Sequence, residues 1–163
     1  MGIVKIYKIK IKTKNNRMNC LVFSSFLFLL PLYIFFNKSK KNNYEYGLSF
    51  LIYINFILSI LFWLNPIKQS IMHKIDVFFA RVSFVCISLY ILFVKNNYLQ
   101  NKNTCQITKF QFISLLILIF ICISTMVYLS NYYSTREWCC NEHFICHCFF
   151  HIFAVMGITI AFL

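Results

Sequence analysis

Residues 110–129, FQFISLLILIFICISTMVYL, decide the class of this fold because they form a run of twenty residues without a single charge. As an α-helix, such a run is about 30 Å long, which matches the hydrocarbon core of a bilayer. A membrane-spanning strand would instead alternate polar and apolar residues, whereas this run is solidly apolar. The stretch therefore predicts a transmembrane helix.

The composition extends this interpretation to the whole chain of 163 residues. Hydrophobic residues make up 60% of the sequence, aromatic residues 20% and charged residues only 12%, which excludes a soluble globular domain. Polar links separate four more apolar runs, at residues 20–36, 46–64, 75–94 and 144–163. We therefore predict an all-α polytopic transmembrane helix bundle of about five spans.

The distribution of charge divides the chain into two parts. Residues 1–19 form a basic N-terminal arm with six Lys and Arg residues, and residues 20–163 form the transmembrane helical domain. A cleaved signal peptide is the alternative for the first apolar run, but no small-residue cleavage site follows Phe36.

The basic arm predicts an integral membrane protein with a cytosolic N-terminus. The net charge is +12, and the basic residues that produce it lie between the apolar spans. This position favours membrane lipids as partners over nucleic acid.

Five spans also determine which links share a membrane face. The link between the second and third spans, residues 65–74, must lie on the same side as the link between the fourth and fifth, residues 131–143. This parity holds whichever way the chain is inserted. His73 is therefore predicted at the same membrane face as His147 and His151, so that a shared site is allowed.

His147 and His151 are four residues apart, so on a helix they project from one face about a turn apart. Two imidazoles in this arrangement can hold one metal ion between them. His143 lies a further turn back on the same side. The alternative is that these histidines are interface residues hydrogen-bonded to neighbouring helices. Ionisable residues that enter a membrane span are costly, and this cost favours a functional role.

Asp76 is one of only four acidic residues in the chain. On a helix it shares a face with His73, which lies three residues earlier. It can act in a site with that histidine, serve as a carboxylate favoured at a helix N-terminus, or pair with Arg81. The sequence leaves these alternatives open.

Four cysteines crowd the histidines of the last span and suggest a second kind of site, a structural Cys/His zinc centre. No CxxC pair is present, and the spacings match no common zinc finger, which makes this alternative the weaker one. Cys105 lies across the membrane from this cluster in the five-span scheme and is not expected to form a disulfide with it. The cluster comprises Cys139, Cys140, Cys146 and Cys148.

The segment HCFFHIFAVMG, from His147 to Gly157, resembles the last-helix HxxxH signature of the CREST superfamily of membrane hydrolase-like proteins. That superfamily includes alkaline ceramidases and the progestin and adiponectin receptors. Ser70, His73 and Asp76 resemble the Ser, His and Asp of its second and third core helices. The superfamily usually has seven spans, whereas this chain has five apolar runs.

The resemblance implies a zinc site and an activity. His73, His147 and His151 would be the metal ligands, Asp76 the general base that accepts a proton from a metal-bound water, and Ser70 a supporting group. Three histidines leave a tetrahedral zinc with one open position, as in catalytic zinc sites. The function implied is a zinc-dependent, membrane-embedded hydrolase of a lipid amide such as ceramide.

A second hypothesis comes from a different class of protein. Polar side chains in spans also serve to hold helices together through interhelical hydrogen bonds. The chain would then be a non-catalytic multi-pass membrane protein, either receptor-like or structural, whose polar residues serve helix packing.

Overall fold

The computed structural model describes residues 20–95 and 109–163. The predicted basic arm, most of the link before the fourth span, and Cys105 lie outside these residues. All regular structure in the described ranges is helical, and five helices are long and apolar enough to cross a membrane. The prediction of an all-α bundle of about five spans is confirmed.

The elements follow one another as helices joined by short turns. The first span, Cys20–Asn37, contains a 3₁₀ turn, η1, before helix α2. The third span, Ile71–Lys95, ends in a π-helical segment, η2. The bounds are η1 Phe26–Phe28, α2 Leu29–Asn37, α3 Asn43–Leu64, α4 Ile71–Leu89, η2 Tyr90–Lys95, α6 Lys109–Arg136 and α7 Asn141–Phe162.

Three helices begin earlier than the apolar runs predicted, because polar residues cap them. Asn42 and Glu45 form a capping box at the start of α3. The Ser70 hydroxyl accepts the His73 N–H at the start of α4, and Cys140 Sγ accepts an N–H at the start of α7. Such caps satisfy free N–H groups of the first turn, so polar residues assigned to links belong to the helices.

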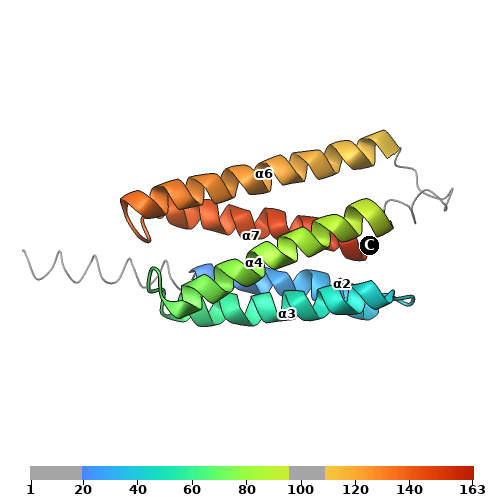
Figure 1. Cartoon of the computed structure of the whole chain (residues 1–163), viewed down its shortest axis with the longest axis horizontal. Helices are drawn as coiled ribbons and strands as arrows, with labels where there is room; N and C mark the ends of the chain where they lie inside the picture. Colours follow the sequence, from blue (N-terminus) through green and yellow to red (C-terminus); the bar gives the residue numbers. More distant parts are fainter. Residues whose placement is uncertain (1–19, 96–108) are drawn as a thin grey trace, which may run out of the picture.

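The helices pack as two pairs bridged by the first span. In the bundle, α3 packs along α4 and α6 packs along α7, while α2 contacts both α3 and α7 (Figure 1). Helices α4 and α6 have little direct contact. One ring pair, Phe84 and Phe120, joins them with centroids 5.6 Å apart. The space between the two helix pairs is therefore open along much of its length.

The turn between α3 and α4 and the turn between α6 and α7 lie at the same end of the bundle (Figure 1). The indole N–H of Trp138 donates to the Pro66 carbonyl oxygen over 3.1 Å, and Lys68 Nζ donates to the Ser134 carbonyl oxygen over 2.5 Å. These contacts place the α3–α4 link beside the α6–α7 link. This agrees with the prediction that, in a chain of five spans, these two links lie on the same side of the membrane.

The opposite end of the bundle is tied by a buried polar cluster, which we name the Glu45 clamp. Glu45 Oε1 accepts from Lys38 Nζ over 2.7 Å and from the Tyr90 hydroxyl over 2.8 Å. Lys38 Nζ also donates to the Phe162 carbonyl oxygen over 2.9 Å. The clamp, made of Lys38, Glu45, Tyr90 and the Phe162 carbonyl, joins the first span, α3, η2 and α7.

Candidate functional site

A cavity of about 1040 Å³ lies between the two helix pairs. Its lining comes from α3, α4, α6 and α7, and its character changes along its length. Near the α3–α4 and α6–α7 turns the wall carries histidines, tryptophans and charged side chains. Farther along, aliphatic and aromatic residues line it, among them Ile87, Ile91, Leu116, Ile119 and Phe120.

Four of the five predicted site residues line this one cavity. His73 and Asp76 contribute from α4, and His147 and His151 contribute from α7. Ser70 does not line it, because its hydroxyl caps α4. The structure therefore brings the predicted histidines and the aspartate to one space but leaves the serine in a structural role.

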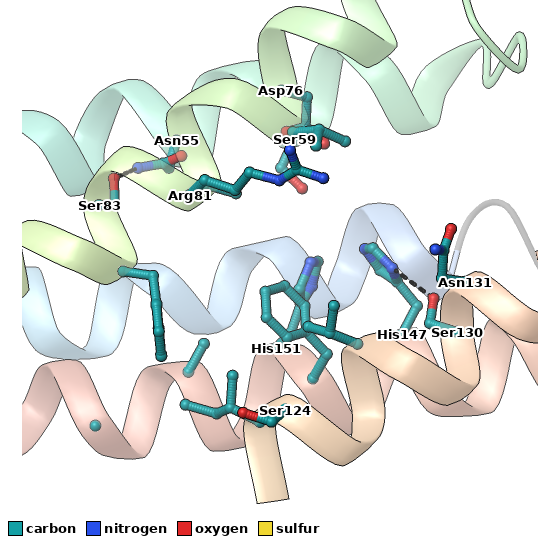
Figure 2. A pocket seen from close by; sticks show the side chains of 18 of the residues that line it. Asn55, Ser59, Asp76, Arg81, Ser83, Ser124, Ser130, Asn131, His147 and His151 are labelled. Carbon is teal, nitrogen blue, oxygen red and sulfur yellow. Dashed lines mark hydrogen bonds between the residues drawn. The ribbon is translucent and has the colours of Figure 1, made fainter. Parts of the chain in front are cut away.

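His147 and His151 are neighbours, as their spacing predicts. Their ring centroids are 4.8 Å apart, and His143 follows at 6.0 Å from His147. Each ring of the pair has a serine beside its Nδ1. Ser130 lies 3.5 Å from His147 Nδ1 (Figure 2), and Ser24 lies 2.9 Å from His151 Nδ1. The pair is thus held by side chains from α6 and from the first span.

Ser24 determines which ring nitrogen of His151 carries the proton. The Ser24 hydroxyl lies 2.9 Å from the Leu21 carbonyl oxygen and 2.9 Å from His151 Nδ1. Since a carbonyl can only accept, the single hydroxyl proton is donated to Leu21. His151 Nδ1–H then donates to Ser24 Oγ. Neutral His151 therefore has its lone pair on Nε2, and no hydrogen bond to this atom is found among residues 20–95 and 109–163.

His73 has the opposite arrangement. The backbone N–H of Gln69 donates to His73 Nδ1 over 3.2 Å, so a neutral His73 carries its proton on Nε2. Its ring stacks on Phe62, with centroids 5.0 Å apart, and packs edge-on against Trp138. His73 is thus held by the turn and by aromatic contacts.

These tautomers give a prediction that NMR can check. The chain has only four histidines, so ¹⁵N-histidine labelling yields four rings, each assignable with a His→Gln variant. We expect the proton of neutral His151 on Nδ1 and that of neutral His73 on Nε2. Ser24→Ala should shift His151 toward the Nε2–H form, whereas Ser24→Thr keeps the acceptor. A proton on Nε2 of His151 in the wild type would contradict the assignment.

The side chains as placed do not fit a three-histidine zinc site. Within residues 20–95 and 109–163, no three His, Cys, Asp or Glu side chains are grouped so that they hold a metal ion. His73 Nδ1 is occupied, which leaves His147 and His151 as the adjacent pair, fewer than the three protein ligands of catalytic zinc. The same finding applies to the cysteine cluster, where Cys140 serves as the cap of α7. Zinc stays a prediction of the resemblance.

Asp76 and Arg81 both line the cavity from α4 (Figure 2). Among the described residues, neither has a hydrogen bond or an ion pair, and the ion pair that is present joins Lys38 to Glu45. The alternative that Asp76 pairs with Arg81 is therefore not realised in this arrangement. Both charges face the cavity without compensation.

Several polar residues of the site were not singled out from the sequence. Ser24 and Ser130 hold the histidine pair, and two polar atoms on the lining, Trp63 Nε1 and His143 Nδ1, are buried without a partner in the described part of the chain. Small polar residues at helical spacing within the spans are the signal that would have pointed to the serines.

Comparisons with known proteins add no relative. No family model matches the sequence. No curated protein and no solved structure was found to match it. The resemblance to the CREST superfamily therefore stays a prediction that rests on the quoted residues.

Proposed function

We propose that this chain is a multi-pass membrane protein that binds one membrane lipid in the cavity between α4 and α6. The observation that carries the proposal is a cavity of about 1040 Å³ with a polar end and an apolar wall. This volume lies at the upper end of the range for ligand sites, which are mostly apolar with a few placed polar groups. An acyl chain would lie along the apolar wall and its head group beside the histidines.

The two helices beside the cavity also favour lateral entry from the bilayer. Helices α4 and α6 are in the two least buried spans, with 22% and 11% of their most apolar windows buried. Their remaining surface faces the surroundings of the bundle, which for apolar spans is lipid. A lipid entering between them would not need to cross water.

The hypothesis of purely structural polar residues accounts for part of the bundle. Ser25 and Ser59 hydroxyls are 2.9 Å apart, and Asn55 donates to Ser83. These bonds join the first span to α3 and α3 to α4, as helix-packing residues do. Asp76 and Arg81 make no such bond within the described part of the chain, so a packing role does not explain them there.

Hydrolysis of a lipid amide such as ceramide is the second candidate. It is favoured by the free Nε2 lone pair of His151 in the cavity and by an unpaired carboxylate, Asp76, on the facing helix. Groups of this kind act as general bases when a substrate lies within hydrogen-bond reach. Lipid binding is required by both candidates, and turnover by the second alone.

The chain offers a matched pair of glycines to test lipid binding. Gly157 lines the cavity, whereas a Cβ built on Gly47 meets nothing within 4 Å. Gly157→Phe is expected to fill the cavity and weaken binding of a fluorescent lipid about 5- to 150-fold, the equivalent of the usual overpacking cost. Gly47→Phe adds the same ring outside the cavity and should bind like the wild type.

The assay uses purified protein in an uncharged maltoside detergent, with fluorescence anisotropy of the lipid as readout. Ala80→Phe, a second cavity substitution, covers the case in which Gly157→Phe fails to fold. Saturable binding that is lost in a folded cavity variant supports the proposal. Binding that is absent in the wild type, or equal in wild type and both folded cavity variants, would refute it.

A further inference from the structure

Three charged side chains line the cavity; Lys68 donates to the Ser134 carbonyl oxygen, whereas Asp76 and Arg81 have opposite signs and do not pair with each other. Asp76 and Arg81 are both on α4, five residues apart, or about 7.5 Å along the helix axis. Both line the cavity, and neither has a hydrogen-bond or ion-pair partner among residues 20–95 and 109–163. They lie on the side of the cavity that faces His147 and His151 (Figure 2).

Asp76 is half-buried and Arg81 is exposed, so the cost of leaving them unpaired arises where their span is surrounded by lipid. Charged side chains within membrane spans normally pair with one another or with backbone carbonyls, because an uncompensated charge in an apolar surrounding is destabilising. Asp76 and Arg81 are close in sequence, yet they do not pair. A ligand that carries both signs would compensate both.

We infer that the cavity selects a lipid with a zwitterionic head group, its cationic part against Asp76 and its anionic part against Arg81. This inference rests on the proposed lipid-binding function and specifies its ligand. A neutral lipid would leave both charges uncompensated. A fatty acid would neutralise Arg81 alone, and a long-chain amine would neutralise Asp76 alone.

A further feature of the polar end fits a head group that is rich in hydrogen-bond acceptors. Trp63 is 1% exposed and His143 4% exposed, and the buried Trp63 Nε1 and His143 Nδ1 lack hydrogen-bond partners in the described ranges. The indole nitrogen of Trp63 is always a donor, and a buried N–H without an acceptor is unfavourable, so an oxygen of a bound ligand would stabilise it.

The test is a competition series with one acyl chain and four head groups. Wild-type protein in maltoside detergent is loaded with the fluorescent lipid and titrated with zwitterionic lysophosphatidylethanolamine, anionic lysophosphatidic acid, neutral monoacylglycerol or a cationic alkylamine. We expect the zwitterion to bind at least about tenfold more tightly than each of the others, since a hydrogen bond to a charged group exceeds 1.4 kcal/mol.

Substitutions separate the contribution of Asp76 to head-group binding from that of Arg81. Arg81→Gln and Asp76→Asn are each expected to weaken lysophosphatidylethanolamine binding about 10- to 100-fold. Lys74→Gln, an exposed residue of α4 that does not line the cavity, is the control and should behave like the wild type.

The outcomes distinguish this inference from the function on which it rests. If monoacylglycerol competes as well as the zwitterion in the wild type, the head-group inference is wrong while the lipid site stands. If no lipid competes, the lipid site itself is wrong. Because the head-group series needs only wild-type protein, misfolding of a variant does not leave the inference undecided.

Discussion

Replacing Lys38 by methionine is expected to lower the free energy of unfolding by about 3 kcal/mol, the lower end of the range for breaking a buried ion pair. The Glu45 side chain is 3% exposed and that of Lys38 24% exposed, with the two charged atoms 2.7 Å apart. Without Lys38, the carboxylate of Glu45 would remain buried with only the Tyr90 hydroxyl and the Asn42 N–H as donors. The partial exposure of Lys38 places the estimate at the lower end.

The link between the first span and α3 provides a matched control. Lys40 is exposed and has no interaction in the described structure, so Lys40→Met should change stability by no more than about 0.5 kcal/mol. Unfolding would be followed by circular dichroism as denaturing detergent is added to micelles. Equal stability of the two variants would show that the Glu45 clamp does not stabilise the bundle.

The clamp could not have been predicted from the pattern of the sequence. Lys38 is one of three lysines in the same polar link, and nothing local separates it from Lys40. The partners of Lys38 come from α3 and from the end of α7, and Glu45 also accepts from Tyr90 of η2. Which lysine meets Glu45 depends on how these distant segments pack, and hydropathy does not report this.

The spans themselves could be predicted because lipid imposes a simple requirement. Every backbone polar group in the hydrocarbon core must be satisfied within the segment, so a long apolar run becomes a helix. The residues at which the helices begin are harder to predict from hydropathy. Asn42, Ser70 and Cys140 are polar or small, and hydropathy counts them with the links, yet their side chains start α3, α4 and α7 by capping.

The candidate site could also be predicted only in part from the sequence. The spacing of His147 and His151 predicts adjacent rings, because helical geometry alone determines it. The orientation of His73 depends instead on the Gln69 backbone and on stacking with Phe62, contacts made by the fold of a turn. The serine beside His151 is 127 residues away in sequence, and no periodicity connects the two.

If the cavity also hydrolyses lipid amides, Asp76→Asn is expected to lower turnover of ceramide by about 10²–10⁴-fold, the usual contribution of a general base. Asparagine keeps the size of the side chain but cannot accept a proton. Binding of ceramide, which has no charged head group, should change little. Initial rates and binding affinity would be measured on the same preparations, with Lys74→Gln as the control on the same helix.

Metal content measured on these preparations separates the zinc hypothesis from the hydrolase hypothesis. The resemblance predicts stoichiometric zinc in the wild type and in Asp76→Asn, and its loss when His147→Ala and His151→Ala are combined. Folded wild-type protein without bound metal would contradict the zinc hypothesis. It would agree with the observation that His73 Nδ1 accepts the Gln69 N–H. Unchanged turnover in Asp76→Asn would remove Asp76 as the base. Absence of turnover with every lipid amide, together with saturable lipid binding, would leave lipid binding as the function.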